Sequence, residues 1–579
     1  MKNSWEEKGL TGYASIDKPW LKYYSDEAIN APLPECTLYE MLWKNNKDHL
    51  DDIAINYFHH RFTYKQLFDG IERAAKAFFA LGVTEGDIVL LSTVNTPETV
   101  YAFYALNRLG VVANMVDPRT SVSGLHDYIL EAGVKVILTV DQVCSSMRKA
   151  AEGTSVKKII RISLADSMPL FTKILYRAKN KLEIDDKESM SWGTFEQLGT
   201  PVCPKYASYK KDTCCVIAHT GGTTGLPKGV MLSNDNFNAV MHAYQYTGIT
   251  FERQHKYFND LPPFIMYGLC LATHTTLCYG LEVIFYPICD AINFPKQFMK
   301  YRPNHFCGLA DHLKYLSTNK KSQKINLEHL ITVGVGGDTI DLGLEKSVNE
   351  YLLEHDCKFE VMKGYGMTEL SATAVSSSPK ANAVGSVGIP FMHNIVKVMS
   401  TETRKELGYN ETGELWVSGP SVMMGYYQKP EETDCIISVD ENGVRWVHTG
   451  DLGYMSENGL LFLEGRIRRI YVTSYEGQPA KIFPMLVEKV LKQSPAVSEC
   501  SVVGRKQKNS DFYEAVAFIV KDEECKNAVD IKKLKDLCIE SLPIYMVPVE
   551  FCFINALPRT PIGKIDFRTL EREAERQSR

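Results

Sequence analysis

The sequence has little net charge of either sign. Among its 579 residues, 65 are Lys or Arg and 70 are Asp or Glu, which leaves a formal net charge of −5. Hydrophobic residues make up 45% of the chain and charged residues 23%, as in an ordinary globular protein. Nucleic-acid binding usually requires a strongly basic surface, so this balance argues against a nucleic-acid partner.

Cysteine is present without any pairing pattern. The fifteen cysteines are scattered from Cys36 to Cys552, and none forms a CxxC pair. An odd count with this spacing fits neither a zinc site nor a disulfide framework. Reduced thiols are the norm in the cytosol, which favours a cytoplasmic protein.

Long apolar runs are also missing. The first residues, MKNSWEEKGLTGYAS, lack the apolar centre of a signal peptide. The most apolar long stretch, residues 268–288, is interrupted by His274 and Glu282, whereas a membrane span requires about 20 apolar residues. We therefore predict a cytoplasmic chain without a transmembrane segment.

Helical spacing alternates with short apolar runs along most of the chain. The runs DIVLLS and VKVILTV follow a segment in which Leu67, Ile71, Ala74 and Phe78 recur at helical spacing. Such alternation is typical of α/β folds, in which largely buried sheets are layered with helices. We therefore predict an α/β fold.

The chain is longer than one hydrophobic core usually supports, so at least two domains are expected. After about Thr449 the pattern changes to turns and strands, and a small lysine-rich unit of mixed helices and strands follows. We predict a large domain of several layered α/β subdomains at residues 1–467 and a small α+β domain at residues 468–579.

The stretch HTGGTTGLPKGVMLSN, residues 219–234, is rich in glycine and threonine. It follows a predicted buried strand at residues 214–218 and precedes a helix that Ser233 or Asn234 would cap. Glycine backbone N–H groups, hydroxyls and Lys228 together suit a triphosphate cradle at residues 220–228. The Walker and GxGxxG patterns do not match this loop. Taken alone, the segment is also compatible with a flexible turn.

Other segments carry the remaining chemistry of a nucleotide site. GYGMTELS offers Tyr365 as a flat surface for a base, Thr368 as a phosphate donor and Glu369 as an oxygen ligand for Mg²⁺. HTGDLGY places Asp451 in a turn, where its carboxylate can accept both hydroxyls of a ribose. Two cations complete the set, Arg466 and Lys564. Each residue is ordinary alone, but together they indicate a magnesium nucleotide site.

The motifs HTGGTTGLPKG, YGMTE, GELWVSGPSVMMGYY, HTGDLGY and LPRTPIGKID occur in the order found in the adenylate-forming (AMP-binding) superfamily. The chain resembles its acyl-CoA synthetase branch over nearly its whole length. The resemblance implies that ATP and a carboxylic acid give an acyl-adenylate and pyrophosphate, after which coenzyme A takes the acyl group and AMP leaves. It also implies Mg²⁺ as a cofactor and a carboxyl-terminal domain that moves as a lid.

The resemblance assigns roles to individual residues. The loop residues expected to hold the phosphates are Thr220, Gly221, Gly222, Thr223, Thr224, Gly225 and Lys228. Those expected around adenine, ribose and the α-phosphate are Gly337, Asp338, Tyr365, Gly366, Met367, Thr368, Asp451 and Arg466. Thr223 and Glu369 would hold the metal, and Lys564 would bridge the carboxylate and the α-phosphate. Lys564, Lys228, Thr223 and Glu369 form the predicted catalytic group.

Two departures from the family pattern affect these expectations. Gly221 stands where relatives usually carry serine or threonine, so one hydroxyl donor is missing. The segment SYEGQPAKIFP is longer than in relatives, and this loop helps to build the thiol-accepting surface. An acyl carrier protein is therefore the alternative acceptor to coenzyme A. A catalytically silent adenylate-binding protein is a further alternative, which the intact Lys228 and Lys564 disfavour.

The expected acyl pocket is apolar and has little side-chain bulk. Its predicted lining is Ile265, Met266, Tyr267, Gly334, Val335 and Gly364. Each buried methylene contributes about 0.8 kcal/mol, so such a slot suits a medium- or long-chain fatty acid. An aryl acid is the alternative. An amino acid is disfavoured because the segment PFIMYG offers no carboxylate for its ammonium group.

Residues 163–182 stand apart from these motifs. After Pro169 they place Leu170, Phe171, Ile174 and Leu175 on one side of a predicted helix. The cations of this segment lie largely elsewhere and are Lys173, Arg177, Lys179 and Lys181. A basic amphipathic helix of this kind is typical of segments that bind anionic lipid or an acidic carrier, and also of ordinary surface helices.

Overall fold

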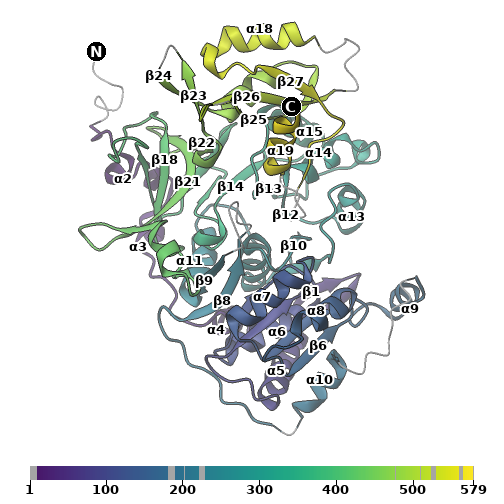
Figure 1. The fold of residues 1–579 in the computed structure, drawn as a ribbon. Helices are drawn as coiled ribbons and strands as arrows, with labels where there is room; N and C mark the ends of the chain where they lie inside the picture. Colours follow the sequence, from purple (N-terminus) through teal and green to yellow (C-terminus); the bar gives the residue numbers. More distant parts are fainter. Residues whose placement is uncertain are drawn as a thin grey trace.

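The computed structural model describes residues 9–179, 189–200, 202–220, 228–475, 478–508, 510–522, 530–559 and 565–577. Two large sheets with helices packed against them form the body of the molecule, and smaller sheets with their own helices lie at the carboxyl-terminal end (Figure 1). The predicted α/β class, with a large amino-terminal part and a small carboxyl-terminal part, is confirmed.

The first large sheet carries the strand that leads into the glycine-rich loop. Its strands, in spatial order, are β19 (Gly425–Tyr426), β9 (Gly229–Ser233), β8 (Cys214–His219), β4 (Val112–Met115), β3 (Ile88–Ser92), β5 (Val136–Val140), β6 (Lys158–Ile162) and β7 (Met190–Ser191). The strands from β8 to β7 pair in parallel, while β8 with β9 and β9 with β19 pair antiparallel. The buried strand predicted at residues 214–218 is therefore β8.

The second large sheet changes from parallel to antiparallel pairing beyond β14. Its parallel part contains β1 (Ile53–Tyr57), β11 (Glu282–Phe285), β10 (Lys256–Asn259), β12 (His305–Gly308), β13 (Thr332–Val335) and β14 (Met362–Tyr365), with β2 (His60–Thr63) antiparallel at the edge. Its antiparallel part contains β15 (Val375–Ser376), β16 (Ser386–Pro390), β22 (Leu461–Arg466), β21 (Arg445–Met455), β18 (Gly413–Ser418) and β17 (Ile395–Met399), with β20 (Ile437–Val439) on β21.

Helices cover these sheets. The α-helices of the body are α2 (Ala14–Asp17), α3 (Asp26–Asn30), α4 (Leu38–Asn46), α5 (Tyr64–Ala80), α6 (Pro97–Arg108), α7 (Val122–Ala132), α8 (Cys144–Ala151), α9 (Leu170–Lys179), α10 (Trp192–Leu198), α11 (Asn234–Gln245), α12 (Thr276–Cys278), α13 (Phe294–Tyr301), α14 (Ala310–Thr318), α15 (Leu342–Glu354) and α16 (Pro430–Asp434). A π-helix, η3, spans Tyr267–Thr275, and the 3₁₀ turns are η1 (Pro19–Tyr23), η2 (Asp141–Val143), η4 (Ser322–Lys324) and η5 (Thr368–Leu370).

Capping side chains begin α5 and α11, and the sequence predicted the cap of α11. Thr63 and Gln66 form a capping box at the start of α5. Ser233 and Asn236 form another capping box at the start of α11. The sequence allowed either Ser233 or Asn234 as the cap, and the structure has Ser233. This box fixes the helix directly after β9, at the far end of the hairpin that holds the glycine-rich loop.

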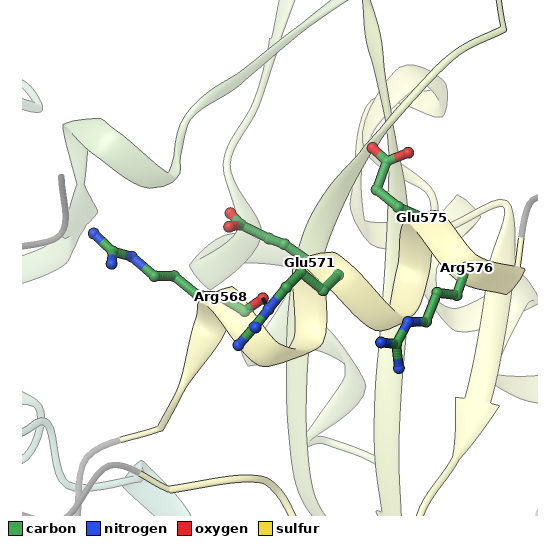
Figure 2. A pocket seen from close by; sticks show the side chains of 5 residues that line it. Arg568, Glu571, Glu575 and Arg576 are labelled. Carbon is green, nitrogen blue, oxygen red and sulfur yellow. Dashed lines mark hydrogen bonds between the residues drawn. The ribbon is translucent and has the colours of Figure 1, made fainter.

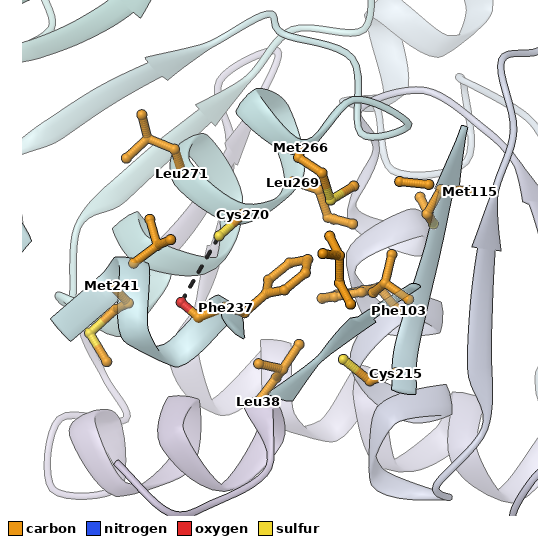
Figure 3. Close-up of a cluster of buried hydrophobic side chains, with 14 of the residues drawn as sticks. Leu38, Phe103, Met115, Cys215, Phe237, Met241, Met266, Leu269, Cys270 and Leu271 are labelled. Carbon is orange, nitrogen blue, oxygen red and sulfur yellow. Dashed lines mark hydrogen bonds between the residues drawn. The ribbon is translucent and has the colours of Figure 1, made fainter. Parts of the chain in front are cut away.

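The main hydrophobic core lies between the first sheet, α6, α11 and the π-helix. Figure 3 shows Phe237 of α11 with Phe103 of α6 and with Met266 and Leu269 from the region of η3, all within one interior cluster. The Cys270 thiol donates a weak hydrogen bond to the Phe237 carbonyl at 4.0 Å. This packing holds the segment that follows the LPPF turn rigidly against the first sheet.

The carboxyl-terminal part has separate sheets and separate cores. It contains β23 (Tyr471–Tyr475), β24 (Gln478–Ile482), β25 (Val497–Lys506), β26 (Tyr513–Lys521) and β27 (Glu550–Phe553), with helices α17 (Pro484–Leu491), α18 (Ile531–Ser541) and α19 (Phe567–Gln577) and the turns η6 (Ile467–Arg469) and η7 (Ile544–Met546). The predicted boundary between residues 467 and 468 falls inside η6. That boundary and the mobility of the carboxyl-terminal part stay predictions.

Ion pairs join the carboxyl-terminal part to the body. Lys314 Nζ lies 2.9 Å from Glu499 Oε1, and Lys492 Nζ lies 3.1 Å from Asp341 Oδ2. Partly exposed pairs of this kind contribute little stability each, so they are contacts that a rearrangement can break at low cost. Among the described residues, no helix combines the length and apolar character required to cross a membrane.

Candidate functional site

The ends of the glycine-rich loop are held together by the β8–β9 hairpin. His219 faces Gly229 in the register of this pair, and the Thr220 N–H donates to the Lys228 carbonyl at 3.1 Å. The predicted phosphate ligands Gly221, Gly222, Thr223, Thr224 and Gly225 lie outside the described residues. The hairpin therefore fixes where the loop leaves and re-enters the sheet, next to Lys228.

Lys228 and Glu369 lie on either side of one tyrosine. The Lys228 ammonium lies 4.9 Å from the centre of the Tyr426 ring, and the Tyr426 hydroxyl donates to Glu369 Oε1 at 2.7 Å. Lys228 also forms an ion pair with Glu432 of α16. The pairing of β19 with β9 brings Tyr426 to this position. Lys228, a predicted phosphate ligand, and Glu369, a predicted metal ligand, therefore both contact Tyr426, which comes from a third segment of the chain.

Glu369 is a buried carboxyl group. Burial raises its pKa above the ordinary value, while the hydrogen bond from Tyr426 acts in the opposite direction. A carboxylate oxygen at this position is a hard ligand, which is the type that Mg²⁺ prefers. Glu369 therefore fits a metal-binding role chemically, and Tyr426 favours the charged form that this role requires.

Asp451 is held by two other predicted site residues. Tyr365 donates its hydroxyl hydrogen to Asp451 Oδ2 at 2.9 Å, and Arg466 Nε lies 2.8 Å from Asp451 Oδ1. Asp451 and Arg466 face each other in the register of β21 and β22, and Tyr365 ends β14. These two contacts fix the orientation of the Asp451 carboxylate at the end of β14 and between β21 and β22.

Tyr267 lies against the glycines that follow β13. A Cβ built on Gly336 would lie 3.3 Å from Tyr267 Cζ and 3.5 Å from the Gly364 carbonyl oxygen. Gly337, with a φ of +81°, has Tyr267 and Leu309 nearby, whereas a Cβ on Gly364 would meet nothing closer than 3.7 Å. Tyr267 therefore packs directly against Gly336, with Gly337 and the Gly364 carbonyl nearby, and Asp338 follows on the exposed side.

Family models decide which enzyme group these motifs represent. A model described as AMP-binding enzyme matches residues 42–427, and one described as AMP-binding enzyme C-terminal domain matches residues 486–564. This chain belongs to the AMP-binding enzyme family. The predicted superfamily and its acyl-CoA synthetase branch are confirmed.

Several proteins resemble this AMP-binding enzyme along nearly its whole length. A long-chain-fatty-acid–CoA ligase of Bacillus subtilis (strain 168) is 29% identical over 575 residues, covering 96% of this chain and 98% of the relative. A 4-coumarate–CoA ligase-like protein of Arabidopsis thaliana is 26% identical over 512 residues, covering 87% and 86%. The ATP-bound structure of MatB from Rhodopseudomonas palustris has a TM-score of 0.79 at 21% identity, covering 93% of this chain and 100% of MatB.

Three predicted pocket residues of this AMP-binding enzyme are taken up by packing. Met266 is buried in the main core, and Val335 packs in a separate core on the other side of β13. A Cβ on Gly334 would lie 2.3 Å from Cys307 Sγ, so Gly334 is small because Cys307 fills the space. Ile265 is half-buried beside the main core. Of the predicted lining, Tyr267 and the Gly364 carbonyl both lie near Gly336, which belongs to the same glycine-rich stretch as Gly334.

The turn after β14 requires glycine for a different reason. A Cβ on Gly366 would lie 2.0 Å from the Ala372 carbonyl oxygen, so only glycine fits this close backbone approach. Met367 and Thr368 follow, both partly exposed, and Thr368 begins η5. This tight turn carries the chain from Tyr365 to Glu369, and it thereby links the Asp451 cluster with the Lys228 cluster.

Sequence reasoning missed Tyr426 and Glu432. Tyr426 lies within the quoted segment GELWVSGPSVMMGYY, which was the available signal, but its contact with Glu369 depends on the pairing of β19 with β9. Glu432 gave no signal, because it belongs to a short exposed helix. Lys564 lies outside the described residues.

A second group of metal-type ligand atoms lies elsewhere in this AMP-binding enzyme. Asp260, Cys289 and His312 bring such atoms within 4.8 Å of one another. The Leu309 N–H donates to His312 Nδ1 at 3.1 Å, and His312 Nε2 lies 3.0 Å from Asp260 Oδ2. Nδ1 is therefore an acceptor and Nε2 carries the proton, which leaves no imidazole lone pair for a metal. The group is a hydrogen-bonded pair with a nearby thiol.

A hollow on the carboxyl-terminal helix α19 contains none of the predicted site residues. Figure 2 shows its lining of charged side chains along this single helix, namely Arg568, Glu571, Arg572, Glu575 and Arg576. Arginine and glutamate side chains one turn apart are typical of a solvated helix face. The hollow is therefore not the candidate site.

Proposed function

We propose that the acid activated by this AMP-forming acyl-CoA synthetase is a medium- or long-chain fatty acid. The observation that supports this proposal is that Tyr267 packs against Gly336 beside Gly337 and the Gly364 carbonyl, so the described neighbours at this position are glycines and a neutral ring. Burial raises the pKa of Tyr267 well above its ordinary value, so its phenol stays uncharged. The B. subtilis relative is named for a long-chain fatty acid, which agrees with this choice.

The proposed first step joins the acid to the α-phosphate of ATP. Lys228 would leave Glu432 and bind the triphosphate together with residues 220–225. Asp451, held by Tyr365 and Arg466, would accept the ribose hydroxyls. A bound Mg²⁺, held by Glu369 and Thr223, would neutralise charge on the phosphate oxygens. Catalysis of this kind is mainly positioning and charge stabilisation.

Lys564 has the most specific proposed role. Its ammonium would lie between the acid and the α-phosphate during attack, and pyrophosphate would leave as the acyl-adenylate forms. The carboxyl-terminal part would then move, coenzyme A would attack the acyl carbonyl, and AMP would leave. The weak ion pairs that join this part to the body agree with such a movement. The relatives named as CoA ligases support coenzyme A as the acceptor.

An aryl acid is the second candidate. The A. thaliana relative is named as a 4-coumarate–CoA ligase-like protein, and the Tyr267 ring would stack against an aromatic acid as readily as it lies along an alkyl chain. A panel of acids from acetate to palmitate, with benzoate and 4-coumarate, distinguishes the two. Each acid is supplied with ATP, Mg²⁺ and coenzyme A, and AMP release and thioester mass are measured. A fatty acid with more than a few methylenes should give the highest kcat/KM, whereas a preference for 4-coumarate or acetate would contradict the proposal.

A further inference from the structure

Helix α9 turns its apolar side away from the protein. Leu170 is 75% exposed, Phe171 74%, Ile174 58% and Leu175 55%. At about 100° per residue these four side chains form one continuous arc of the helix. In Figure 1, α9 stands at the edge of the molecule beyond β6 and α10. Surface helices of globular proteins normally turn this side inward, so α9 has the opposite orientation.

Polar contacts on the inner side fix this orientation. Gln142 Nε2 donates to the Tyr176 hydroxyl at 2.6 Å, and the Lys173 ammonium donates to the Asp166 carbonyl at 3.2 Å. Both contacts come from the side opposite the exposed arc. The apolar arc is therefore presented outward by a helix that is attached to the body through its polar side.

The charge of this region identifies the kind of surface that would cover the arc. Within its own bounds α9 carries Lys173, Arg177 and Lys179 and no acidic residue, whereas the sequence that follows, EIDDKE at residues 183–188, is acidic. Arg177 is exposed and borders the arc next to Leu170. An apolar strip with a cation at its border, on a helix whose own charges are all positive, matches the boundary between acyl chains and phosphate headgroups in an anionic bilayer.

A second copy of this chain matches the region less well. Two copies of α9 facing each other would bring cations together, which is unfavourable. Four side chains also fall far short of the roughly 800 Å² per partner found in standard protein interfaces. The positive charge of α9 and the small area of the arc therefore favour lipid.

We propose that α9 is an interfacial helix that docks this protein on anionic membrane surfaces. Leu170, Phe171, Ile174 and Leu175 enter the boundary between headgroups and acyl chains, while Arg177 stays at the level of the lipid phosphates. This proposal goes beyond the proposed function, because it concerns a surface remote from the nucleotide motifs and does not depend on which acid is activated.

The test uses the purified full chain without ATP or substrate. Binding is measured by co-sedimentation with phosphatidylcholine vesicles, with and without phosphatidylglycerol. We expect binding to the anionic vesicles, little binding to neutral ones, and loss of binding at about 1 M salt, where charges are screened within ~3 Å. The double variant Phe171→Ser/Ile174→Ser should reduce the partition coefficient by at least about tenfold. The matched control Leu353→Ser/Val439→Ser changes residues that are 76% and 63% exposed elsewhere, and it should bind like the parent chain.

A charge variant gives a second readout if the double variant is poorly folded. Arg177→Glu should weaken binding to anionic vesicles by about fivefold or more and leave the melting temperature unchanged. The proposal is overturned if the parent chain does not bind anionic vesicles, or if the control variant loses as much binding as the α9 variant. It is also overturned if sedimentation velocity shows a dimer that Phe171→Ser/Ile174→Ser dissociates, since a second copy would then cover the arc.

Discussion

Substitution of Tyr426 by phenylalanine should shift the acidic limb of the pH–rate profile to higher pH. Glu369 must be a carboxylate to hold a metal, and the Tyr426 hydroxyl donates to it at 2.7 Å within the buried site. A hydrogen bond to a charged group contributes about 1.5–3 kcal/mol. At about 1.4 kcal/mol per pH unit, its loss raises the Glu369 pKa and moves the limb upward by about one to two pH units. Burial already raises this pKa, so the two effects add.

The assay is kcat/KM for AMP formation between about pH 5 and pH 9 at saturating Mg²⁺. Activity at the alkaline end should change little, because Glu369 is a carboxylate there with or without the hydrogen bond. Tyr427→Phe is the matched control, since the neighbouring tyrosine contacts Gln428 instead. An equal loss at every pH, a shift to lower pH, or the same shift in the control would refute the reasoning.

Three further predictions test the proposed reaction, the buried carboxyl of Glu98 and the packing around the acyl site. Lys564→Ala should slow pyrophosphate exchange about 100-fold or more and leave thioester formation from supplied acyl-adenylate largely intact; equal loss in both half-reactions would exclude its proposed role. Burial raises the pKa of Glu98 from 4.5 to about 7, so the folded protein loses stability as pH rises through this range. Glu98→Gln should therefore increase the free energy of unfolding by about 3 kcal/mol at pH 8 and by less than about 1 kcal/mol at pH 5. An equal gain in melting temperature at pH 5 and pH 8 would contradict this prediction. Gly364→Ala should lower kcat/KM for palmitate about threefold relative to butyrate with little loss of stability, because its Cβ would meet Thr373 Cγ2 only at an ordinary contact distance of 3.7 Å. Gly334→Ala should instead destabilise the fold, because its Cβ collides with Cys307 Sγ, and the opposite ranking in melting temperature would disprove the assignment of the slot.

The sequence was sufficient for features that depend on local patterns. Alternating apolar runs and helical spacing predicted the layered α/β class and the strand β8, and they limited the cap of α11 to Ser233 or Asn234. Motif order predicted the family. Asp451 and Arg466 were predicted as one site, and their side chains contact each other because β21 and β22 pair in the required register.

The remaining features depend on contacts between distant segments. Val335 was predicted to line the pocket, but side chains alternate across a strand, so Val335 packs in the opposite core and the neighbour of Tyr267 is Gly336. The role of Tyr426 depends on the pairing of β19 with β9, which no local pattern specifies. The outward rotation of α9 was also beyond the sequence, because amphipathic spacing alone does not say which side faces the body.

The most direct test of the central claim is an experimental structure of the protein with ATP, Mg²⁺ and a non-reactive fatty-acid analogue. The account predicts that the ribose hydroxyls contact Asp451, that the triphosphate replaces Glu432 at Lys228, and that the metal binds Glu369. It also predicts that the alkyl chain lies beside Tyr267, Gly336 and Gly364. A triphosphate remote from Lys228, or an alkyl chain bound away from Tyr267, would contradict it.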